Sequence, residues 1–209
     1  MKILDIENWN RKEHYRFFSE YDEPFFGIVS EIDCTIAYQI AKENNYSFFA
    51  YYLHKSLCAA NKIEEFKYRI DGDNVIVYDD IHASSTISRD DETFAFSHTT
   101  YNQDFNSFEN SLKKEIEIVK NSVGLRADIN ANRKDVIQFS SIPWSKFTGL
   151  THARHFKFVD SIPKITFGKM FTRDKYKIMP ISVNVHHGLA DGVHVSKYLN
   201  LFQELMDEN

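Results

Sequence analysis

The residues whose types and spacing favour chemistry lie near the C-terminus, in the stretch VNVHHGLADGVHV. This stretch contains three histidines and one aspartate: His186, His187, Asp191 and His194. Imidazole and carboxylate groups this close together are typical of a metal site, of general base catalysis, or of a buried polar cluster without chemistry. The elements that position these side chains distinguish the three possibilities.

The segment before the histidines has the alternation of a β-strand. Every second residue from Met179 to Val185 is apolar, and His187 continues that face, whereas His186 lies on the opposite face. A histidine at the end of a buried strand face is held rigidly and is partly desolvated, which favours the neutral imidazole that a general base requires. The pattern therefore favours His187 as a base, with an ordinary buried histidine as the alternative.

The other polar residues of the stretch allow more than one interpretation. Adjacent histidines on a strand point to opposite faces, so His186 and His187 are poorly placed to share one ion, and we expect no metal site. His194 is expected on the surface of the closing helix. Asp191 precedes Gly192 at the turn into that helix, where it can cap the helix or act together with the histidine.

Composition indicates one globular domain over residues 1–209. The chain is 43% hydrophobic, with 18 Phe and 11 Tyr, which is enough apolar surface for a sizeable core. A net charge of -5 disfavours a nucleic-acid partner, and no segment resembles a signal peptide or a membrane span. Cys34 and Cys58 lie outside any Cys-x-x-Cys spacing, so we expect no disulfide framework or thiolate zinc site. The expected location is the cytoplasm, without a membrane partner.

Hydrophobic periodicity predicts an α+β fold with helices on one side of a sheet. Strands are expected within 24–35, 84–89, 93–100 and 136–144, and on both sides of a turn at 172–175, with a hairpin at Asp71-Gly72. Helices are expected over 36–45, 47–63, 104–124 and 193–209.

The C-terminal stretch resembles the H-H-x-x-x-D-G signature of the chloramphenicol acetyltransferase family. Dihydrolipoamide acyltransferase domains and peptide-synthetase condensation domains share this signature more loosely. Three further segments, NWNRKEHYRFF, DDETFAFSHTTY and SSIPWSKFTGL, resemble blocks of the first family, and they come in its order and spacing together with IPKITFGKM. The resemblance therefore covers nearly the whole chain and favours the chloramphenicol acetyltransferases.

This resemblance implies a single-domain two-layer sandwich, with helices packed on one side of a mixed, mostly antiparallel sheet. It also implies a homotrimer with active sites between subunits and direct transfer of acetyl from acetyl-CoA to a hydroxyl, without a permanently bound cofactor. His187 corresponds to the base of the family. Ser140 corresponds to the serine that stabilises the oxyanion, and Asp191 and Arg11 correspond to an ion pair that braces the site.

The acceptor pocket matches the family only in part. Phe94 and Thr166 occupy matching positions, whereas Phe18 stands where antibiotic-modifying members carry a tyrosine, and His152 stands where they carry a leucine. His152 either selects a different acceptor or is solvated. The resemblance also suggests Trp144 as a contact of CoA.

Three hypotheses follow for the activity. The first is a chloramphenicol O-acetyltransferase that confers antibiotic resistance. The second is an acyltransferase of the same fold that acts on another hydroxylated small molecule and confers no resistance. The third is a non-catalytic trimeric binding module.

Overall fold

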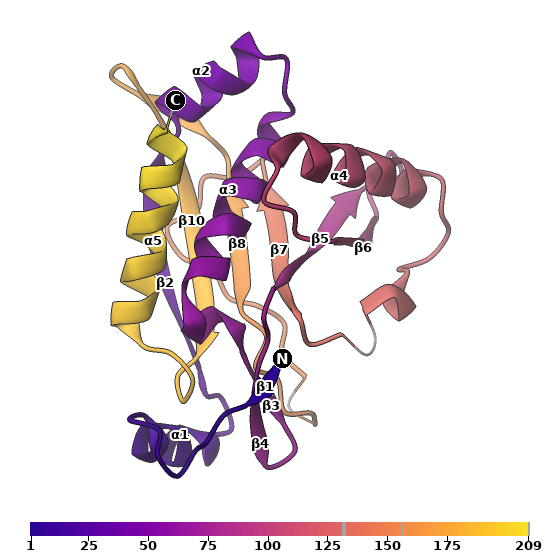
Figure 1. The fold of residues 1–209 in the computed structure, drawn as a ribbon. Coiled ribbons are helices and arrows are strands. Elements are labelled where there is room, and N and C mark those ends of the chain that lie inside the picture. The colour runs from indigo at the N-terminus through magenta and orange to yellow at the C-terminus, as the bar shows by residue number, and fades with distance from the viewer. Residues whose placement is uncertain (131–132, 156, 209) are drawn as a thin grey trace.

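The main sheet of the protein is mixed and mostly antiparallel. The computed structural model describes residues 1–130, 133–155 and 157–208 (Figure 1). The strand order is β2-β10-β8-β7-β5-β6, with the short strand β9 beside β10. Among the described strands of this sheet, β5–β7 and β7–β8 pair in parallel, and the other pairs are antiparallel. The strands are β2 (Phe25–Asp33), β5 (His82–Ser88), β6 (Phe94–Thr99), β7 (Val136–Ile142), β8 (Lys164–Gly168), β9 (Phe171–Arg173) and β10 (Tyr176–His186).

Helices cover one face of this sheet, as the periodicity predicts (Figure 1). They are α2 (Thr35–Glu43), α3 (Phe48–Lys62), α4 (Phe105–Lys120) and α5 (Gly192–Asp207). Helix α1 (Lys12–Ser19) lies at one end of the molecule, near a small sheet with strand order β1-β4-β3. The strands of this sheet are β1 (Lys2–Ile3), β3 (Tyr68–Asp71) and β4 (Asn74–Val77), and short 3-10 turns occupy Glu64–Lys67 and Ala127–Asn130.

The main core lies between the helices and the sheet. The alternating apolar residues of β10, from Met179 to Val185, are buried there together with residues of α3 and α5. Helix α3 begins where the sequence predicts, because the Ser47 side chain accepts a hydrogen bond from the Ala50 N–H. This packing fixes which face of β10 each side chain occupies.

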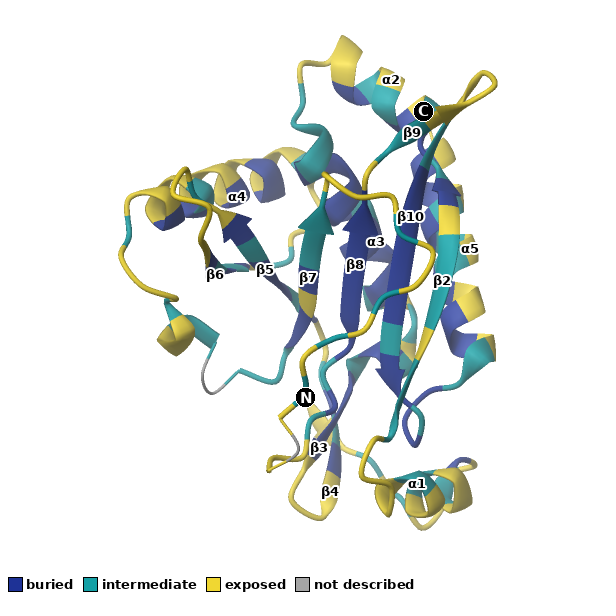
Figure 2. Cartoon of the chain, turned by 180° about the vertical axis from the view of Figure 1, so that it is seen from behind, coloured by how far each residue is buried: buried dark blue, intermediate teal, exposed yellow. Residues whose placement is uncertain are grey.

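In the part of the chain that the structure describes, no helix covers the opposite face of the sheet (Figure 2). Ser140, Thr166 and Ser182 stand side by side on it, since they are register partners across β7, β8 and β10. The connection between β7 and β8 runs in front of this face in Figure 2. We call this side of the sheet the open face.

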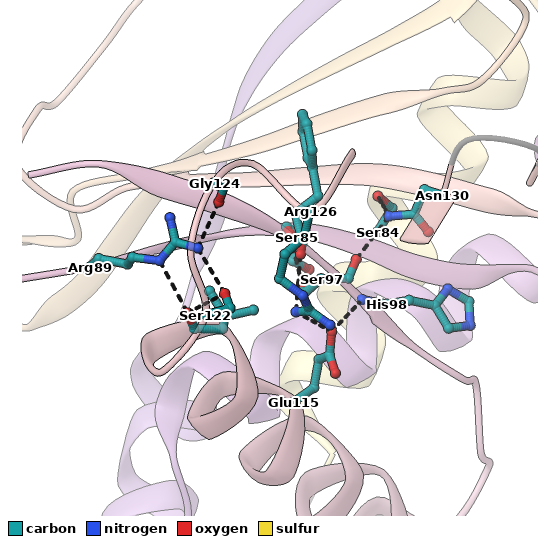
Figure 3. Close-up of polar contacts among 12 residues, drawn as sticks. Ser84, Ser85, Arg89, Ser97, His98, Glu115, Ser122, Gly124, Arg126 and Asn130 are labelled. Carbon is teal, nitrogen blue, oxygen red and sulfur yellow. Dashed lines mark hydrogen bonds and ion pairs between the residues drawn. The ribbon is translucent and has the colours of Figure 1, made fainter. Parts of the chain in front are cut away.

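Polar contacts attach the edge hairpin β5–β6 to α4 and the segment that follows it (Figure 3). Glu115 of α4 accepts hydrogen bonds from Arg126 at 2.8 Å and from the backbone N–H of His98 at 3.2 Å. Arg89 donates to the Gly124 carbonyl and the Ser122 hydroxyl. These contacts hold the part of the sheet next to Ser140.

The structure corrects the sequence-based elements in three places. Helix α1 was not predicted, because its segment carries charges throughout. The region after residue 163 forms three strands instead of two, and α4 ends at Lys120 instead of continuing to Gly124. The hairpin at Asp71-Gly72 is confirmed, with Gly72 at a φ of 58° that glycine adopts without steric cost. Within the described residues, no helix is both long enough and apolar enough to cross a bilayer.

Candidate active site

His187 lies directly beyond β10, and two aromatic rings hold its side chain. Its imidazole stacks on Phe18 of α1 at a centroid distance of 4.0 Å and an interplanar angle of 11°. Phe26 contacts it at 4.5 Å, and Phe26 is the register partner of Val185 on the face that the helices cover. His187 therefore continues the apolar face, as the alternation predicts.

The ring of His187 is positioned by packing and not by side-chain hydrogen bonds. Its Nδ1 is buried and has no hydrogen-bond partner among residues 1–130, 133–155 and 157–208. The backbone is fixed instead, because the His187 N–H donates to the Pro24 carbonyl at 2.8 Å. A half-buried imidazole with a fixed plane is suited to proton transfer along one direction.

Arg11 and Asp191 form an ion pair next to His187. The Arg11 Nη1 donates to the Asp191 Oδ2 at 2.5 Å, and the Arg11 Nη2 donates to the His187 carbonyl at 3.1 Å. Asp191 also caps α5, since its side chain accepts a hydrogen bond from the Val193 N–H. Asp191 therefore caps the helix and also ties the segment before α1 to the turn after β10.

The ion pair is stabilised by charge in a partly buried setting. Burial would raise the pKa of the Asp191 carboxyl, but the hydrogen bond from Arg11 and the nearby His194 and Arg11 charges hold it below its usual value. The Arg11 side chain is almost fully buried, and this carboxylate is its countercharge.

Replacement of Asp191 by asparagine should destabilise the protein by about 2 kcal/mol. Asparagine still caps α5, so the change removes only the countercharge of the buried Arg11. The cost is below the ~3–5 kcal/mol of a fully buried pair because Asp191 is partly exposed. Urea denaturation measures it, and Glu7→Gln, which weakens the ion pairs of the exposed Glu7 with Arg16 and Lys12, is the matched control and should change stability little. Equal costs for the two variants would contradict the bracing role.

His194 is not on the helix surface, contrary to the prediction. Its side chain is buried, its Nδ1 accepts a hydrogen bond from the Asp191 N–H at 3.0 Å, and its Nε2 lies 3.3 Å from Glu65. The residue completes a capping box with Asp191 at the start of α5. Histidine is uncommon in this role, so the sequence carries no signal for it.

His186 lies on the opposite face of β10 from the apolar residues, and it is only 3% exposed. Its Nδ1 accepts a hydrogen bond from the Gly188 N–H at 3.1 Å. Burial, followed by the nearby Arg154 charge, lowers the pKa of His186 to about 4. Among the described residues, no three His, Cys, Asp or Glu side chains come together as metal ligands would.

The buried His186 predicts a loss of stability between pH 6.5 and pH 4. The unfolded chain binds a proton near the ordinary pKa of 6.5, whereas the folded chain binds it only near pH 4, so acidification favours unfolding. The contribution reaches up to about 3 kcal/mol at the acid end. Urea denaturation at pH 7 and pH 4.5 should show a smaller difference for His186→Gln than for the unaltered protein, and parallel losses would contradict this assignment.

Ser140 lies on the open face, in the middle of the sheet. Its hydroxyl is 3.3 Å from that of Thr86 on the neighbouring strand. Ser141 faces the core, where its hydroxyl lies 3.0 Å from that of Tyr52. Strand alternation therefore places the two adjacent serines on opposite faces of the sheet. Phe94 lies half-exposed at the start of β6. It precedes Phe96, the register partner of Thr86, by two residues.

Thr166 and His152 each carry a buried polar atom on this side of the sheet. The Thr166 Oγ1 and the His152 Nε2 are both buried, and neither has a hydrogen-bond partner in the part of the chain that the structure describes. Thr166 is in register with Ser140, and His152 lies in the connection between β7 and β8. Trp144, at the start of that connection, is 71% exposed.

Charged residues of this connection and of β8 form ion pairs that the sequence does not indicate. Lys164 donates to Asp160 at 2.6 Å, and Arg154 lies 3.3 Å from Glu23 with its guanidinium 3.4 Å from the centre of the Phe25 ring. Alternation in β8 could have indicated Lys164, because it shares a face with Thr166. The ion pairs of Arg154 and Asp160 carry no comparable signal.

A single chain does not bring His187 and Ser140 together. Ser140 of β7 is the register partner of Thr166 in β8, and Thr166 is the register partner of Ser182 in β10. His187 lies five residues beyond Ser182 along the chain. Strand spacings of about 4.8 Å and a rise of about 3.3 Å per residue place the two roughly 19 Å apart. Phe18, Arg11 and Asp191 lie with His187, whereas Thr166 lies with Ser140.

Comparison with known proteins identifies the family. The family model described as chloramphenicol acetyltransferase matches residues 1–203. This chain belongs to the chloramphenicol acetyltransferase family. It is accordingly an acyltransferase. It is 27% identical to the chloramphenicol acetyltransferase of Proteus mirabilis, over 99% of this chain and 94% of that protein. It is 28% identical to chloramphenicol acetyltransferase 3 of Escherichia coli, over 97% and 95% of the two chains.

Solved structures agree with this membership. A chloramphenicol acetyltransferase structure superimposes with a TM-score of 0.91 and 33% identity, covering 98% of this chain and 99% of that chain. A probable dihydrolipoamide acetyltransferase from Listeria monocytogenes has a TM-score of 0.71 at 13% identity, covering 99% and 93% of the two chains. The second likeness shows the fold alone. The α+β sandwich predicted for a chloramphenicol acetyltransferase relative is thereby confirmed.

Proposed function

We propose that the protein is an acetyl-CoA-dependent O-acetyltransferase, with chloramphenicol as the first acceptor to test. The observation that carries the proposal is the placement of His187. Its imidazole is fixed between Phe18 and Phe26, and its carbonyl is held by the Arg11–Asp191 pair. Such a side chain is held in one orientation before substrates bind, as general base catalysis requires.

The proposed reaction transfers the acetyl group directly. His187 removes the proton of the acceptor hydroxyl while the oxygen attacks the thioester carbonyl of acetyl-CoA. Ser140 donates a hydrogen bond to the oxyanion of the tetrahedral intermediate. The intermediate then releases the CoA thiolate, and the imidazolium of His187 returns the proton to it. The products are the acetyl ester and CoA, and His187 is neutral again.

We propose that the active site is shared between subunits of a homotrimer. The distance of roughly 19 Å between His187 and Ser140 within one chain supports this, because both residues must reach one reacting carbonyl. A second copy can bring its His187 to the open face of the first. The proposal includes one domain over residues 1–209 and a cytoplasmic location.

Mixed oligomers test the shared site. Chains carrying His187→Ala and chains carrying Ser140→Ala should each be nearly inactive alone. Co-expressed in equal amounts, they should regain roughly a quarter of the normal activity, since random mixing in a trimer pairs an intact His187 with an intact Ser140 at about one interface in four. Light scattering checks the trimer mass. A monomer, or no recovery in confirmed mixed trimers, would contradict the proposal.

Acetyl-CoA is proposed as a co-substrate and not as a permanently bound cofactor. Trp144 offers an exposed aromatic surface beyond the end of β7. Nearby in sequence, Lys146 lies with its ammonium 3.8 Å from the centre of the Phe171 ring. An exposed aromatic side chain and a lysine two residues later are of the types that suit the adenine and the phosphates of CoA.

The activity is tested by incubating the protein with acetyl-CoA, chloramphenicol and a thiol reagent. Thiol release above a His187→Ala control is expected. Release only with other hydroxylated compounds would keep the acyltransferase and replace the acceptor, an alternative that the buried, unpaired His152 Nε2 favours. No release with any acceptor, together with measurable acceptor binding, would indicate a binding module. Growth of a sensitive host in the presence of the drug checks whether resistance is conferred.

A further inference from the structure

His194 has a carboxylate near each of its two ring nitrogens. Its Nε2 lies 3.3 Å from the Glu65 Oε1, and its Nδ1 lies 3.0 Å from the Asp191 Oδ1. The Nδ1 also accepts a hydrogen bond from the Asp191 backbone nitrogen, which lies 3.0 Å away. A neutral imidazole carries a proton on only one nitrogen, so the position of that proton decides which of these contacts is favourable.

The capping box at the start of α5 requires the proton of His194 to be on Nε2. With the proton there, Nδ1 can accept from the Asp191 N–H, and the Asp191 carboxylate accepts from the Val193 N–H and from Arg11. With the proton on Nδ1, the ring would donate to the Asp191 Oδ1 instead, and the Asp191 N–H would lose this acceptor. The second arrangement would compete with Arg11 for the carboxylate.

Glu65 favours the arrangement with the proton on Nε2. Its carboxylate only accepts hydrogen bonds, so it attracts a ring N–H and repels an unprotonated ring nitrogen. The side chains of Glu65 and His194 are 23% and 10% exposed, so salt and water screen this contact less than a surface pair. The turn that carries Glu65 is itself held in place, because the adjacent Phe66 is fully buried and stacks on Tyr198 of α5 at a centroid distance of 4.8 Å.

A continuous series of contacts leads from Glu65 to the proposed base. Glu65 faces the Nε2 of His194, and the Nδ1 of the same ring holds the backbone of Asp191. The Asp191 carboxylate holds Arg11, and Arg11 donates to the His187 carbonyl at 3.1 Å. A change at Glu65 can therefore reach His187 without any direct contact between the two.

We propose that Glu65 is a positioning residue for the reaction: it keeps the proton of His194 on Nε2, which leaves the Asp191 carboxylate available to Arg11. This inference rests on the proposed function, in which His187 is the base. Glu65 acts through His194, Asp191 and Arg11, and it takes no part in the transfer of the proton or the acetyl group.

Substitutions in the turn test the inference by thiol release with acetyl-CoA and an accepted hydroxyl compound. Glu65→Ala should lower kcat about tenfold and change the KM values little, because a small displacement of the base slows the reaction. Glu65→Gln should keep kcat within about twofold, since its amide oxygen still accepts from the Nε2–H. A normal kcat for Glu65→Ala, or an equal loss for Glu65→Gln, would overturn the inference.

Glu64→Ala is the matched control. Glu64 belongs to the same turn, but it is exposed, and its carboxylate contacts Lys2 and the Tyr68 hydroxyl. This variant should keep a normal kcat. A loss as large as that of Glu65→Ala would mean that any change in the turn disturbs the site, and it would also overturn the inference.

A double-mutant cycle separates positioning from packing. In Asp191→Asn the carboxylate that holds Arg11 is already absent, so adding Glu65→Ala should lower kcat no further. Additive losses in kcat would mean that Glu65 acts independently of Asp191, and they would contradict the proposal.

NMR of the protein with ¹⁵N-labelled histidine tests the same contacts without a substrate. At about pH 8, where histidine is ordinarily neutral, His194 should carry its proton on Nε2. Glu65→Ala should move this proton partly to Nδ1 and shift the His187 resonances, whereas Glu65→Gln should do neither. An unchanged proton position in Glu65→Ala would overturn the inference. The expected NMR changes in a protein that acetylates no acceptor would support the control of His187 by Glu65 and refute the acetyltransferase function.

Discussion

Replacement of His187 by glutamine is expected to lower kcat by about 10³-fold, within the range of roughly 10²–10⁴ that general bases contribute. Glutamine keeps a planar side chain between Phe18 and Phe26 but cannot accept the hydroxyl proton at neutral pH. The KM values for both substrates should change much less than kcat. Stopped-flow thiol release with acetyl-CoA and an accepted hydroxyl compound measures the effect.

His186→Gln is the matched control for this prediction. His186 is the adjacent histidine, but it is buried on the other face of β10, and its low pKa excludes a proton-transfer role near pH 7. The variant should keep kcat within a few-fold at pH 7. If both variants lost activity equally, the assignment of the base to His187 would be wrong and the loss would reflect distortion of the turn after β10.

Replacement of Ser140 by alanine is expected to lower kcat by about 10²-fold, since a positioned oxyanion donor typically contributes 10²–10³-fold. Its hydroxyl contacts only Thr86 among the described side chains, so folding should be little affected. Steady-state kinetics and thermal unfolding measure the two effects separately.

Ser141→Ala separates catalysis from packing. The Ser141 hydroxyl contacts Tyr52 on the core side of the sheet, so its removal should reduce stability and leave kcat nearly unchanged. The two neighbouring serines should thus show opposite profiles. A Ser140→Ala variant with normal kcat would remove Ser140 from the mechanism.

Strand alternation predicted the placement of His187 because the period of a strand is a local property, whereas Ser140 was indicated by the family resemblance. The same local pattern of apolar residues indicated which face of the strands packs against the helices. It carries no information about contacts between segments that are distant in the sequence. The Arg11–Asp191 pair joins residues 180 positions apart, and in the sequence only the family resemblance indicates it.

The residues that the sequence placed wrongly or missed depend on tertiary contacts. His194 was expected on the surface because its neighbours Val193 and Lys197 do not reveal that Glu65 lies beside it. Lys164 and Arg154 are long charged side chains, which are usually solvated, and only the packing of the β7–β8 connection buries them. The mismatch of the acceptor pocket was visible in the sequence at His152, but its unpaired Nε2 was not.

The position of β10 has a consequence for how the protein is made. It is the last strand of the sheet along the sequence, yet it lies inside the sheet, between β2 and β8. A growing chain on the ribosome therefore carries two unpaired strand edges, at β2 and β8, until β10 has emerged. Such edges recruit other incomplete chains, so we expect folding to be slow and the nascent protein to depend on chaperones more than a sheet built from sequential hairpins would.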